Sequence, residues 1–210
     1  MNLLRRVGAA ALFALVLSPS TWAAQPPVIV AFGDSLTAGL GVAAEQNYPS
    51  RLEQTLRAAG YPHRVINAGI SGDTTAGGLR RVDAVLALHP VIVILEFGAN
   101  DGLRGAPLPE IRANLDQIIR RLQTAKIRVV LAGMKLPPNY GPEYTDRFAA
   151  LYAELARQRH AALIPFFLDG VAGVDGLNQA DGLHPTAEGY RIIVDRIWPR
   201  LRPLLGRRPR

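Results

Sequence analysis

The sequence predicts an α/β fold, a three-layer α/β/α sandwich with a central five-stranded parallel sheet. Short apolar runs alternate with segments of helical periodicity along the chain, which is the order expected of strand–helix–strand units. Polar, glycine-rich segments directly follow the first three of these runs. The chain has 210 residues, of which 49% are hydrophobic, and this suffices for one core. No repeat or linker divides it, so a single domain is expected.

Five short apolar runs are the expected strands. Each is bounded by polar residues, glycine or proline, which favours a strand buried in a parallel sheet. The runs are Val28–Phe32, Arg64–Asn67, Val91–Phe97, Arg128–Ala132 and Ala162–Pro165.

The segments between these runs have the spacing of amphipathic helices. Helices are expected over Tyr48–Ala59 and Thr74–Leu88. Two more are indicated by apolar faces at helical spacing, formed by Ile111, Leu115, Ile118, Ile119 and Leu122 and by Phe148, Leu151, Tyr152 and Leu155. A last helix is expected over Ala187–Trp198, with Pro199 ending it because proline interrupts helical hydrogen bonding.

Residues 1–23 have the pattern of a secretory signal peptide. Two arginines precede the apolar stretch Val7–Leu17, and Thr21 and Ala23 are small at the positions that a signal peptidase reads. We therefore expect cleavage after Ala23, a domain over 24–199 and a periplasmic or secreted protein without stable membrane insertion. The alternative is an uncleaved anchor, but a bilayer span needs about 20 apolar residues.

The formal net charge of +7 lies at the two ends of the chain. The span 24–199 holds 17 basic and 17 acidic residues, so no basic groove for nucleic acid is expected. Residues 200–210 form a basic tail, which we expect to be solvated. The chain has no cysteine, and this excludes disulfides and thiolate catalysis.

Three polar segments are expected to meet at one edge of the sheet. GDSLTAG (33–39), NAGISGDTT (67–75) and GANDGLRG (98–105) follow the first, second and third strands. In a parallel sheet the ligand site lies beyond the carboxyl ends of the strands. The three segments together therefore predict a pocket.

A serine, an aspartate and a histidine are the candidate catalytic residues. Ser35 lies in the first of these segments, while Asp181 and His184 lie in DGLHPT (181–186), before the last helix. A serine hydroxyl becomes nucleophilic when a histidine takes its proton, and a carboxylate orients that histidine. Asp181 is three residues before His184 and can reach its Nδ1 atom. A serine in isolation would equally be a helix cap. The GxSxG pattern of α/β-hydrolases is absent, because Thr37 occupies the position of its second glycine.

Such chemistry also needs hydrogen-bond donors for the negatively charged oxygen of a tetrahedral intermediate. The candidates for this oxyanion hole are the backbone N–H groups of Ser35 and Gly69 and the side-chain amide of Asn100. We interpret Asp34 and Asp101 as acceptors that brace the loops. A metal site is the competing interpretation of His184, but the sequence holds no HExxH motif or other cluster to complete one, so no metal is expected.

The same four segments resemble those of the SGNH (GDSL-type) hydrolases. The blocks are GDSLTAG with Ser35, NAGISGDTT with Gly69, GANDGLRG with Asn100, and DGLHPT with Asp181 and His184. The likeness is greatest to the bacterial periplasmic thioesterase I, arylesterase and lysophospholipase group. It covers about residues 28–199 and includes LPPNYGPEY at 136–144. One departure is Ala99, where that group often carries a second glycine.

The resemblance implies a flavodoxin-like fold and a serine esterase or thioesterase without cofactor. Its substrates would be small-molecule carboxylic esters and acyl thioesters, including aryl esters and lysophospholipids. Leu103, Leu136 and Tyr140 would line an acyl-chain pocket between two loops. A monomer is expected. The alternatives are a carbohydrate O-acetylesterase with the same residues and a non-catalytic binding module of the envelope.

Overall fold

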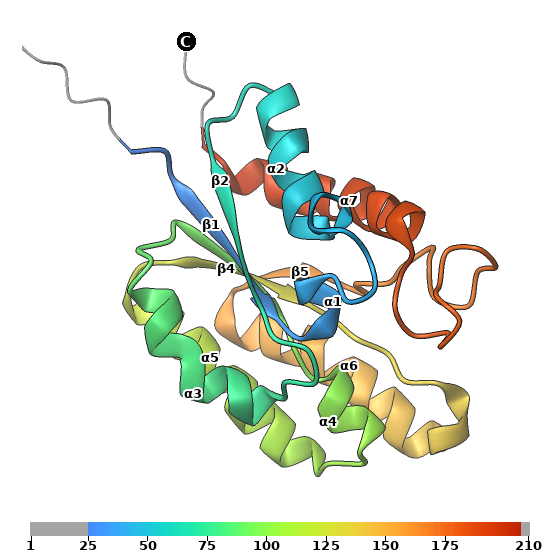
Figure 1. Cartoon of the computed structure of the whole chain (residues 1–210). Coiled ribbons are helices and arrows are strands. Elements are labelled where there is room, and N and C mark those ends of the chain that lie inside the picture. The colour runs from blue at the N-terminus through green and yellow to red at the C-terminus, as the bar shows by residue number, and fades with distance from the viewer. Residues whose placement is uncertain (1–24, 207–210) are drawn as a thin grey trace, which may run out of the picture.

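The central sheet has five parallel strands in the order β2-β1-β3-β4-β5, as a computed structural model of the chain shows for residues 25–206 (Figure 1). The strands are β1 (Val28–Gly33), β2 (Arg64–Gly69), β3 (Ile92–Glu96), β4 (Arg128–Ala132) and β5 (Ala162–Ile164). All five predicted strands are confirmed, with ends that differ by at most two residues. The expected signal peptide and its cleavage site lie outside the described residues.

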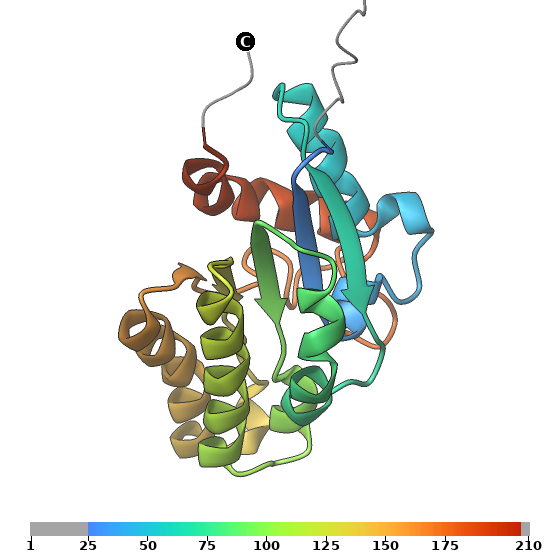
Figure 2. The same cartoon turned by 90° about the vertical axis from the view of Figure 1, so that its left-hand side faces the viewer.

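Helices cover both faces of the sheet, so the predicted three-layer architecture is confirmed (Figures 1 and 2). The helices of four residues or more are α1 (Ser35–Ala38), α2 (Tyr48–Ala58), α3 (Thr75–Leu86), α4 (Ala99–Leu103), α5 (Leu108–Thr124), α6 (Pro142–Arg159) and α7 (Ala187–Leu201). Three 3₁₀ turns are η1 (Ala44–Gln46), η2 (Pro138–Tyr140) and η3 (Arg202–Leu204). Helix α2 packs beside α7 on one face, and α3, α5 and α6 pack side by side on the other.

The apolar faces predicted for the two long helices are those that the core buries. All five apolar residues of the α5 pattern are fully buried, and so are the apolar residues of the α6 pattern to within 5% exposure. Strands β1 and β3, in the interior of the sheet, are buried along nearly their whole length because helices cover both of their faces. Burial of these surfaces supplies the main stabilisation of the fold.

The prediction that Pro199 ends the last helix is wrong. Helix α7 continues through Pro199 to Leu201, and η3 follows directly. Ile197, Leu201 and Leu205 are all buried, so packing of this last turn against the core outweighs the hydrogen bond that proline cannot make. Residues 200–205 therefore belong to the packed structure. The basic tail expected over residues 200–210 does not begin as early as residue 200.

The register of the inner strands brings the polar segments together. Gly33, at the end of β1, pairs with Gly69 of β2 on one side and with Glu96 of β3 on the other. The three segments that follow these strands consequently leave the sheet at the same edge, as predicted.

Candidate active site

Ser35 is the first residue of α1, directly beyond the end of β1. The helix is capped by Asp34, whose Oδ1 atom accepts a hydrogen bond from the Leu36 N–H at 3.0 Å. The Ser35 side chain therefore does not serve as the cap, and its hydroxyl is free for another partner. The residue is 8% exposed. Its backbone N–H has no hydrogen-bond partner within residues 25–206.

His184 and Asp181 lie in one tight turn before α7. Asp181 Oδ1 accepts hydrogen bonds from the backbone N–H groups of Leu183 at 2.9 Å and His184 at 3.0 Å. Asp181 Oδ2 lies 2.6 Å from His184 Nδ1. The His184 backbone N–H has the largest effect on the Asp181 carboxyl group, and together these bonds lower its pKa to about 2. Asp181 is therefore a carboxylate at neutral pH.

His184 Nε2 lies 2.8 Å from Ser35 Oγ, across 149 positions of sequence. Since Asp181 accepts the hydrogen on Nδ1, the lone pair of Nε2 faces the serine hydroxyl. The structure thus brings together the three side chains that the sequence singled out. This geometry allows the histidine to take a proton from the serine.

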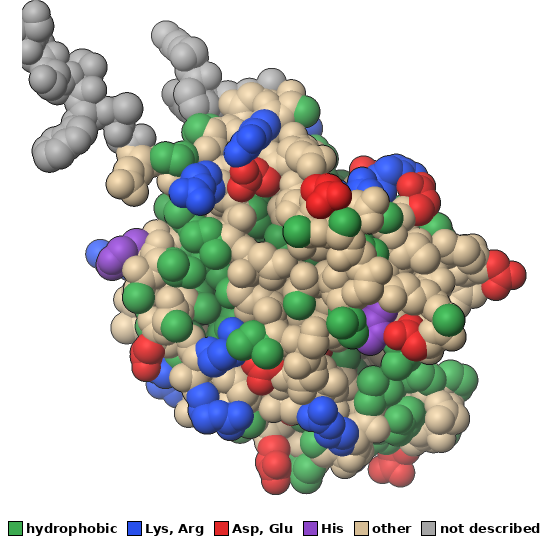
Figure 3. Space-filling view, viewed as in Figure 1, with side chains coloured by type: hydrophobic (Ala, Val, Ile, Leu, Met, Phe, Trp, Pro, Cys, Tyr) green, Lys and Arg blue, Asp and Glu red, His purple; other side chains and the backbone are tan. Residues whose placement is uncertain are grey.

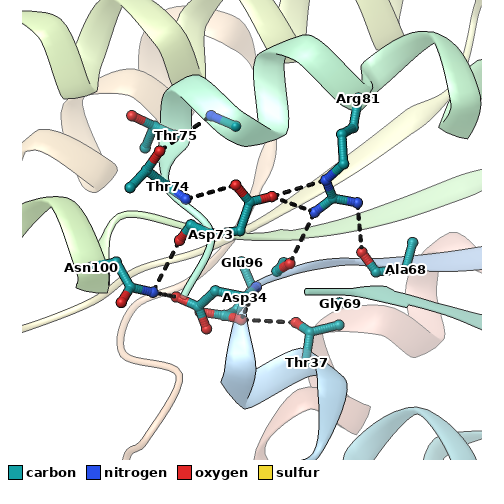
Figure 4. A network of polar contacts seen from close by, with 12 residues as sticks. Asp34, Thr37, Ala68, Gly69, Asp73, Thr74, Thr75, Arg81, Glu96 and Asn100 are labelled. Carbon is teal, nitrogen blue, oxygen red and sulfur yellow. Dashed lines mark hydrogen bonds and ion pairs between the residues drawn. The ribbon is translucent and has the colours of Figure 1, made fainter. Parts of the chain in front are cut away.

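The side chain of Asn100 joins the three loops at the edge of the sheet (Figure 4). Its Nδ2 atom donates one hydrogen bond to Asp34 Oδ2 and another to the carbonyl oxygen of Asp73, both at 3.0 Å. Both amide hydrogens are therefore in use. Binding of an oxyanion by this amide requires one of these two bonds to be exchanged.

Gly69, the last residue of β2, and Gly72, in the turn that follows, differ in the availability of their N–H groups. The Gly69 N–H donates to Asn67 Oδ1 at 2.9 Å, and a Cβ atom at Gly69 would lie 2.2 Å from the Ala38 nitrogen. Glycine is needed at 69 for the close approach of α1, and its N–H is occupied. Gly72, which the sequence analysis did not single out, has a φ of 78°. No acceptor in the described part of the chain binds its N–H.

Two buried carboxyl groups lie beneath α1. Glu96 is fully buried, and its Oε2 atom accepts hydrogen bonds from Thr37 Oγ1 at 2.8 Å and from the Asp34 N–H at 3.4 Å. Burial raises the pKa of Asp34 to about 6. Burial, followed by the charge of Asp34, raises the pKa of Glu96 well above its ordinary value. Both carboxyl groups therefore bind a proton more readily than a carboxyl group in water does.

Arg81 of α3 binds the side chain of Asp73, the residue after Gly72 (Figure 4). Its guanidinium binds Asp73 Oδ2 at 2.6 and 2.9 Å and donates to the carbonyl oxygens of Ala68 and Gly33. Sequence reasoning missed this residue and also left Glu96 without a role. Each is a single charged residue in an ordinary helix or strand pattern, so no local signal marks it.

Asp34 and Asp101 accept hydrogen bonds within the loops, as expected from the sequence. Asp101 accepts hydrogen bonds from Thr75 Oγ1 at 2.6 Å and from the Thr75 N–H at 2.9 Å. Asp34 accepts from Leu36 and Asn100, as described above. Both are loop-bracing acceptors, and this prediction is confirmed.

A cavity of about 130 Å³ opens beside Ser35 and His184. Leu103 and Leu136 line it, as expected, together with Met134, Pro137 and Leu168. Tyr140 does not belong to its lining. The Tyr140 hydroxyl instead donates to the carbonyl oxygen of Leu103 at 2.8 Å and so braces the wall from behind. Hydrophobic side chains gather over η2 and the start of α6 (Figure 3).

Within residues 25–206, no group of three or more histidine, aspartate or glutamate side chains is arranged to hold a metal ion. None of the helices in that span has the length and apolar character needed to cross a membrane.

Comparison with known proteins identifies the family. Residues 31–192 match the model of the GDSL-like lipase/acylhydrolase family. The chain belongs to this family. As a GDSL-like hydrolase it is an ester-hydrolysing enzyme, and the resemblance expected from the four blocks is confirmed.

Individual members of the GDSL-like family match nearly the whole chain. The chain is similar to esterase TesA of Pseudomonas aeruginosa, with 45% identity over 91% of this chain and 95% of the relative. It is 36% identical to the thioesterase 1/protease 1/lysophospholipase L1 of Escherichia coli over 88% of each chain. The crystal structure of TesA superposes with a TM-score of 0.82, covering 84% of this chain and 99% of that one at 43% identity.

Proposed function

We propose that the protein hydrolyses carboxylic esters and acyl thioesters through an acyl-enzyme on Ser35. The observation that carries the proposal is the continuous chain of hydrogen bonds from Ser35 Oγ through the His184 ring to Asp181 Oδ2, at 2.8 and 2.6 Å. In this reaction the serine is the nucleophile, the histidine is the general base and the aspartate orients the imidazole.

The reaction has two half-reactions. Ser35 Oγ attacks the carbonyl carbon while His184 Nε2 takes the hydroxyl proton, and the imidazolium formed is stabilised by ionised Asp181. His184 then gives the proton to the departing alkoxide or thiolate, which leaves an acyl group on Ser35. A water molecule, deprotonated by His184, attacks the ester carbonyl and regenerates the free serine with release of the carboxylic acid.

Three donors are proposed for the oxyanion. The Ser35 N–H is unpaired, and the Asn100 amide can exchange its bond to Asp73 or Asp34 for one to the oxyanion. For the third donor we propose the free N–H of Gly72 in place of Gly69, because the Gly69 N–H is held by Asn67. The peptide of Asp73, next along the chain from Gly72, already contacts Asn100, so the turn and the amide are neighbours. Removing one such donor typically lowers kcat by about 10²–10³.

The proposed substrates are acyl chains on small alcohols, phenols or thiols. Leu103 and Leu136 supply an apolar wall beside the reacting serine, and this favours an acyl chain over a polar one. The names of the similar proteins include esterase, thioesterase and lysophospholipase, and these activities define the range proposed here. The residues in their proposed roles complete the chemistry without a cofactor.

We propose that the mature protein acts in the periplasm or outside the cell, as a monomer. The arginines and apolar stretch at the N-terminus motivate the location, and the equal numbers of acids and bases in 24–199 argue against a nucleic-acid partner.

Kinetics on the purified mature protein test the function. We expect turnover of 4-nitrophenyl esters and acyl thioesters, loss of that turnover in Ser35→Ala with an unchanged circular dichroism spectrum, and labelling of the wild type by a fluorophosphonate at Ser35. Ser50→Ala is the matched control, since that hydroxyl binds the carbonyl oxygen of Ala44. Retained turnover in Ser35→Ala would refute the proposal. A rate that peaks with acetyl and collapses by octanoyl would favour the O-acetylesterase alternative instead.

A further inference from the structure

Lys135 stands between two hollows of the surface. It lines the catalytic cavity with Met134 and Leu136, and it also lines a neighbouring hollow of about 500 Å³ with Phe166 and Arg200. It is the one cationic side chain in the lining of the catalytic cavity. The Lys135 side chain therefore lies at the border between the catalytic cavity and the neighbouring hollow.

The backbone next to Lys135 is held by hydrogen bonds to residues 164–167, at the end of β5 and directly after it. The Gly133 N–H donates to the carbonyl oxygen of Ile164 at 2.8 Å, and the Gly133 carbonyl oxygen accepts from Phe167 at 2.8 Å. A Cβ atom at Gly133 would lie 2.4 Å from the Pro165 carbonyl oxygen, so the two segments are in direct contact. Lys135 Nζ lies 5.0 Å from the centre of the Phe166 ring, at cation–π distance.

No carboxylate neutralises this ammonium group. Within residues 25–206 no aspartate or glutamate oxygen lies within 4.0 Å of Lys135 Nζ. The acids of the neighbouring hollow have other partners, because Asp169 faces Arg196 and Asp195 binds Arg191. The ammonium is thus held over an aromatic ring with no anion of its own.

The two hollows differ in chemistry. The catalytic cavity presents leucine, methionine and proline side chains, whereas the hollow beyond Lys135 adds the charged groups of Arg196 and Arg200. An acyl chain on Ser35 fits the apolar wall, and a charged acyl chain would be desolvated there at a cost. A charged part of the substrate is therefore better placed in the leaving group, and the hollow that adjoins the cavity at Lys135 supplies the cationic groups.

We propose that Lys135 forms a subsite for a negatively charged leaving group, such as one that carries a sulfonate or phosphate. The proposal rests on the esterase function proposed above and adds a preference among its substrates. An exposed charge pair changes binding by about fivefold at most and is screened by salt. We therefore expect a preference of that size at low ionic strength.

A matched pair of aryl esters tests the subsite. 4-Butanoyloxybenzenesulfonate carries a negative charge on the leaving group, and 4-butanoyloxybenzenesulfonamide is its neutral analogue. In Lys135→Gln we expect kcat/KM for the sulfonate to fall about fivefold, while the value for the sulfonamide stays within twofold. Salt should weaken the preference of the wild type and leave the variant unaffected. Lys126→Gln is the control, because Lys126 is the other lysine of the chain and is exposed before β4.

Three other outcomes would contradict the proposed subsite, and a fourth would contradict the proposed function. An equal fall for both esters would assign Lys135 a structural role, and an unchanged ratio with normal turnover would overturn the subsite alone. A loss confined to 4-nitrophenyl glutarate, whose charge is on the acyl side, would overturn the leaving-group assignment. If the wild type does not hydrolyse the neutral sulfonamide ester, the proposed function itself fails. The neutral ester thus reports on the function, and the charged-to-neutral ratio reports on Lys135.

Discussion

The side-chain amide of Gln179 donates a hydrogen bond to the carbonyl oxygen of Leu40 at 2.7 Å, linking the loop of His184 to the segment that follows Ser35. The same Nε2 atom donates to the Pro185 carbonyl oxygen at 2.9 Å. The Gln179 backbone N–H donates to the carbonyl oxygen of His184 at 2.7 Å. One side chain therefore helps to set the separation of the serine and the histidine.

Gln179→Ala should lower kcat more than it affects KM. Loss of both donors frees the His184 loop, and a small misplacement of a catalytic group costs rate because the reaction needs close alignment. We expect a fall of about tenfold in kcat with an unchanged melting temperature to within a few degrees. Stopped-flow or steady-state kinetics measure it. Gln117→Ala, on the exposed face of α5, is the control, and equal kinetics in the two variants would contradict the role of Gln179.

Asp181→Asn should lower kcat by about 10³–10⁴ while leaving the fold intact. The amide that replaces the carboxylate can donate to Nδ1, which would put the ring hydrogen on Nε2, facing Ser35 with no lone pair to accept its proton. The pKa of Asp181 is lowered to about 2, so this carboxylate stays ionised in wild-type protein at pH 4. Single-turnover kinetics at pH 7 provide the measurement. Activity within tenfold of wild type would show that Asp181 is dispensable for orienting the base.

Asp34 and Glu96 should make the protein more stable in mild acid than at neutral pH. The folded pKa of Asp34 is raised, to about 6, so the folded state binds this proton more tightly than the unfolded state. Its contribution is complete below about pH 4 and is lost as the pH rises through 6, on the order of 1–3 kcal/mol. Urea unfolding at pH 4, 5, 6 and 7 measures the slope.

Asp34→Asn should flatten that pH dependence, because the side chain no longer titrates. The amide oxygen of asparagine can still cap α1 through the Leu36 N–H. Its NH₂ group faces the donor of Asn100, so activity should also fall. A pH slope in this variant equal to that of the wild type would exclude Asp34 as its source and leave Glu96, which Glu96→Gln then tests.

Gly72→Ala should lower kcat by about 10- to 100-fold, because strain at its positive φ re-aims the N–H proposed for the oxyanion. A steric clash does not contribute to this effect, since a Cβ atom at Gly72 would have no atom within 4 Å. Gly60→Ala is a matched control: its φ is 79°, its surroundings are equally open, and it lies in the turn between α2 and β2. If both variants lose stability alike and neither loses activity, Gly72 is not a donor.

The strands, the long helices and the meeting of Ser35 with His184 followed from the sequence because each has a local signal. Apolar runs and helical spacing mark elements whose burial decides their position, as the fully buried residues of α5 illustrate. Parallel topology then sends the segments after β1, β2 and β3 to one edge. The short helices α1 and α4 span too few residues for a periodic pattern to reveal them.

Features that depend on packing between distant residues were not predictable. Nothing near Glu96 in the sequence indicates that β3 places it beneath Asp34, or that burial raises the pKa of both carboxyl groups. The Gly69 N–H seemed available because its partner Asn67 is two residues away and its side-chain direction depends on the fold. Tyr140 bonds to a backbone oxygen 37 positions distant, and this takes it out of the cavity.

The most direct test is to trap the covalent intermediate. Rapid acid quenching of the enzyme with 4-nitrophenyl butanoate, followed by peptide mass spectrometry, should find one butanoyl group on the peptide that contains Ser35. The adduct should accumulate in wild type and be absent from Ser35→Ala. A butanoyl group on any other residue, formed and released at the rate of turnover, would contradict the account.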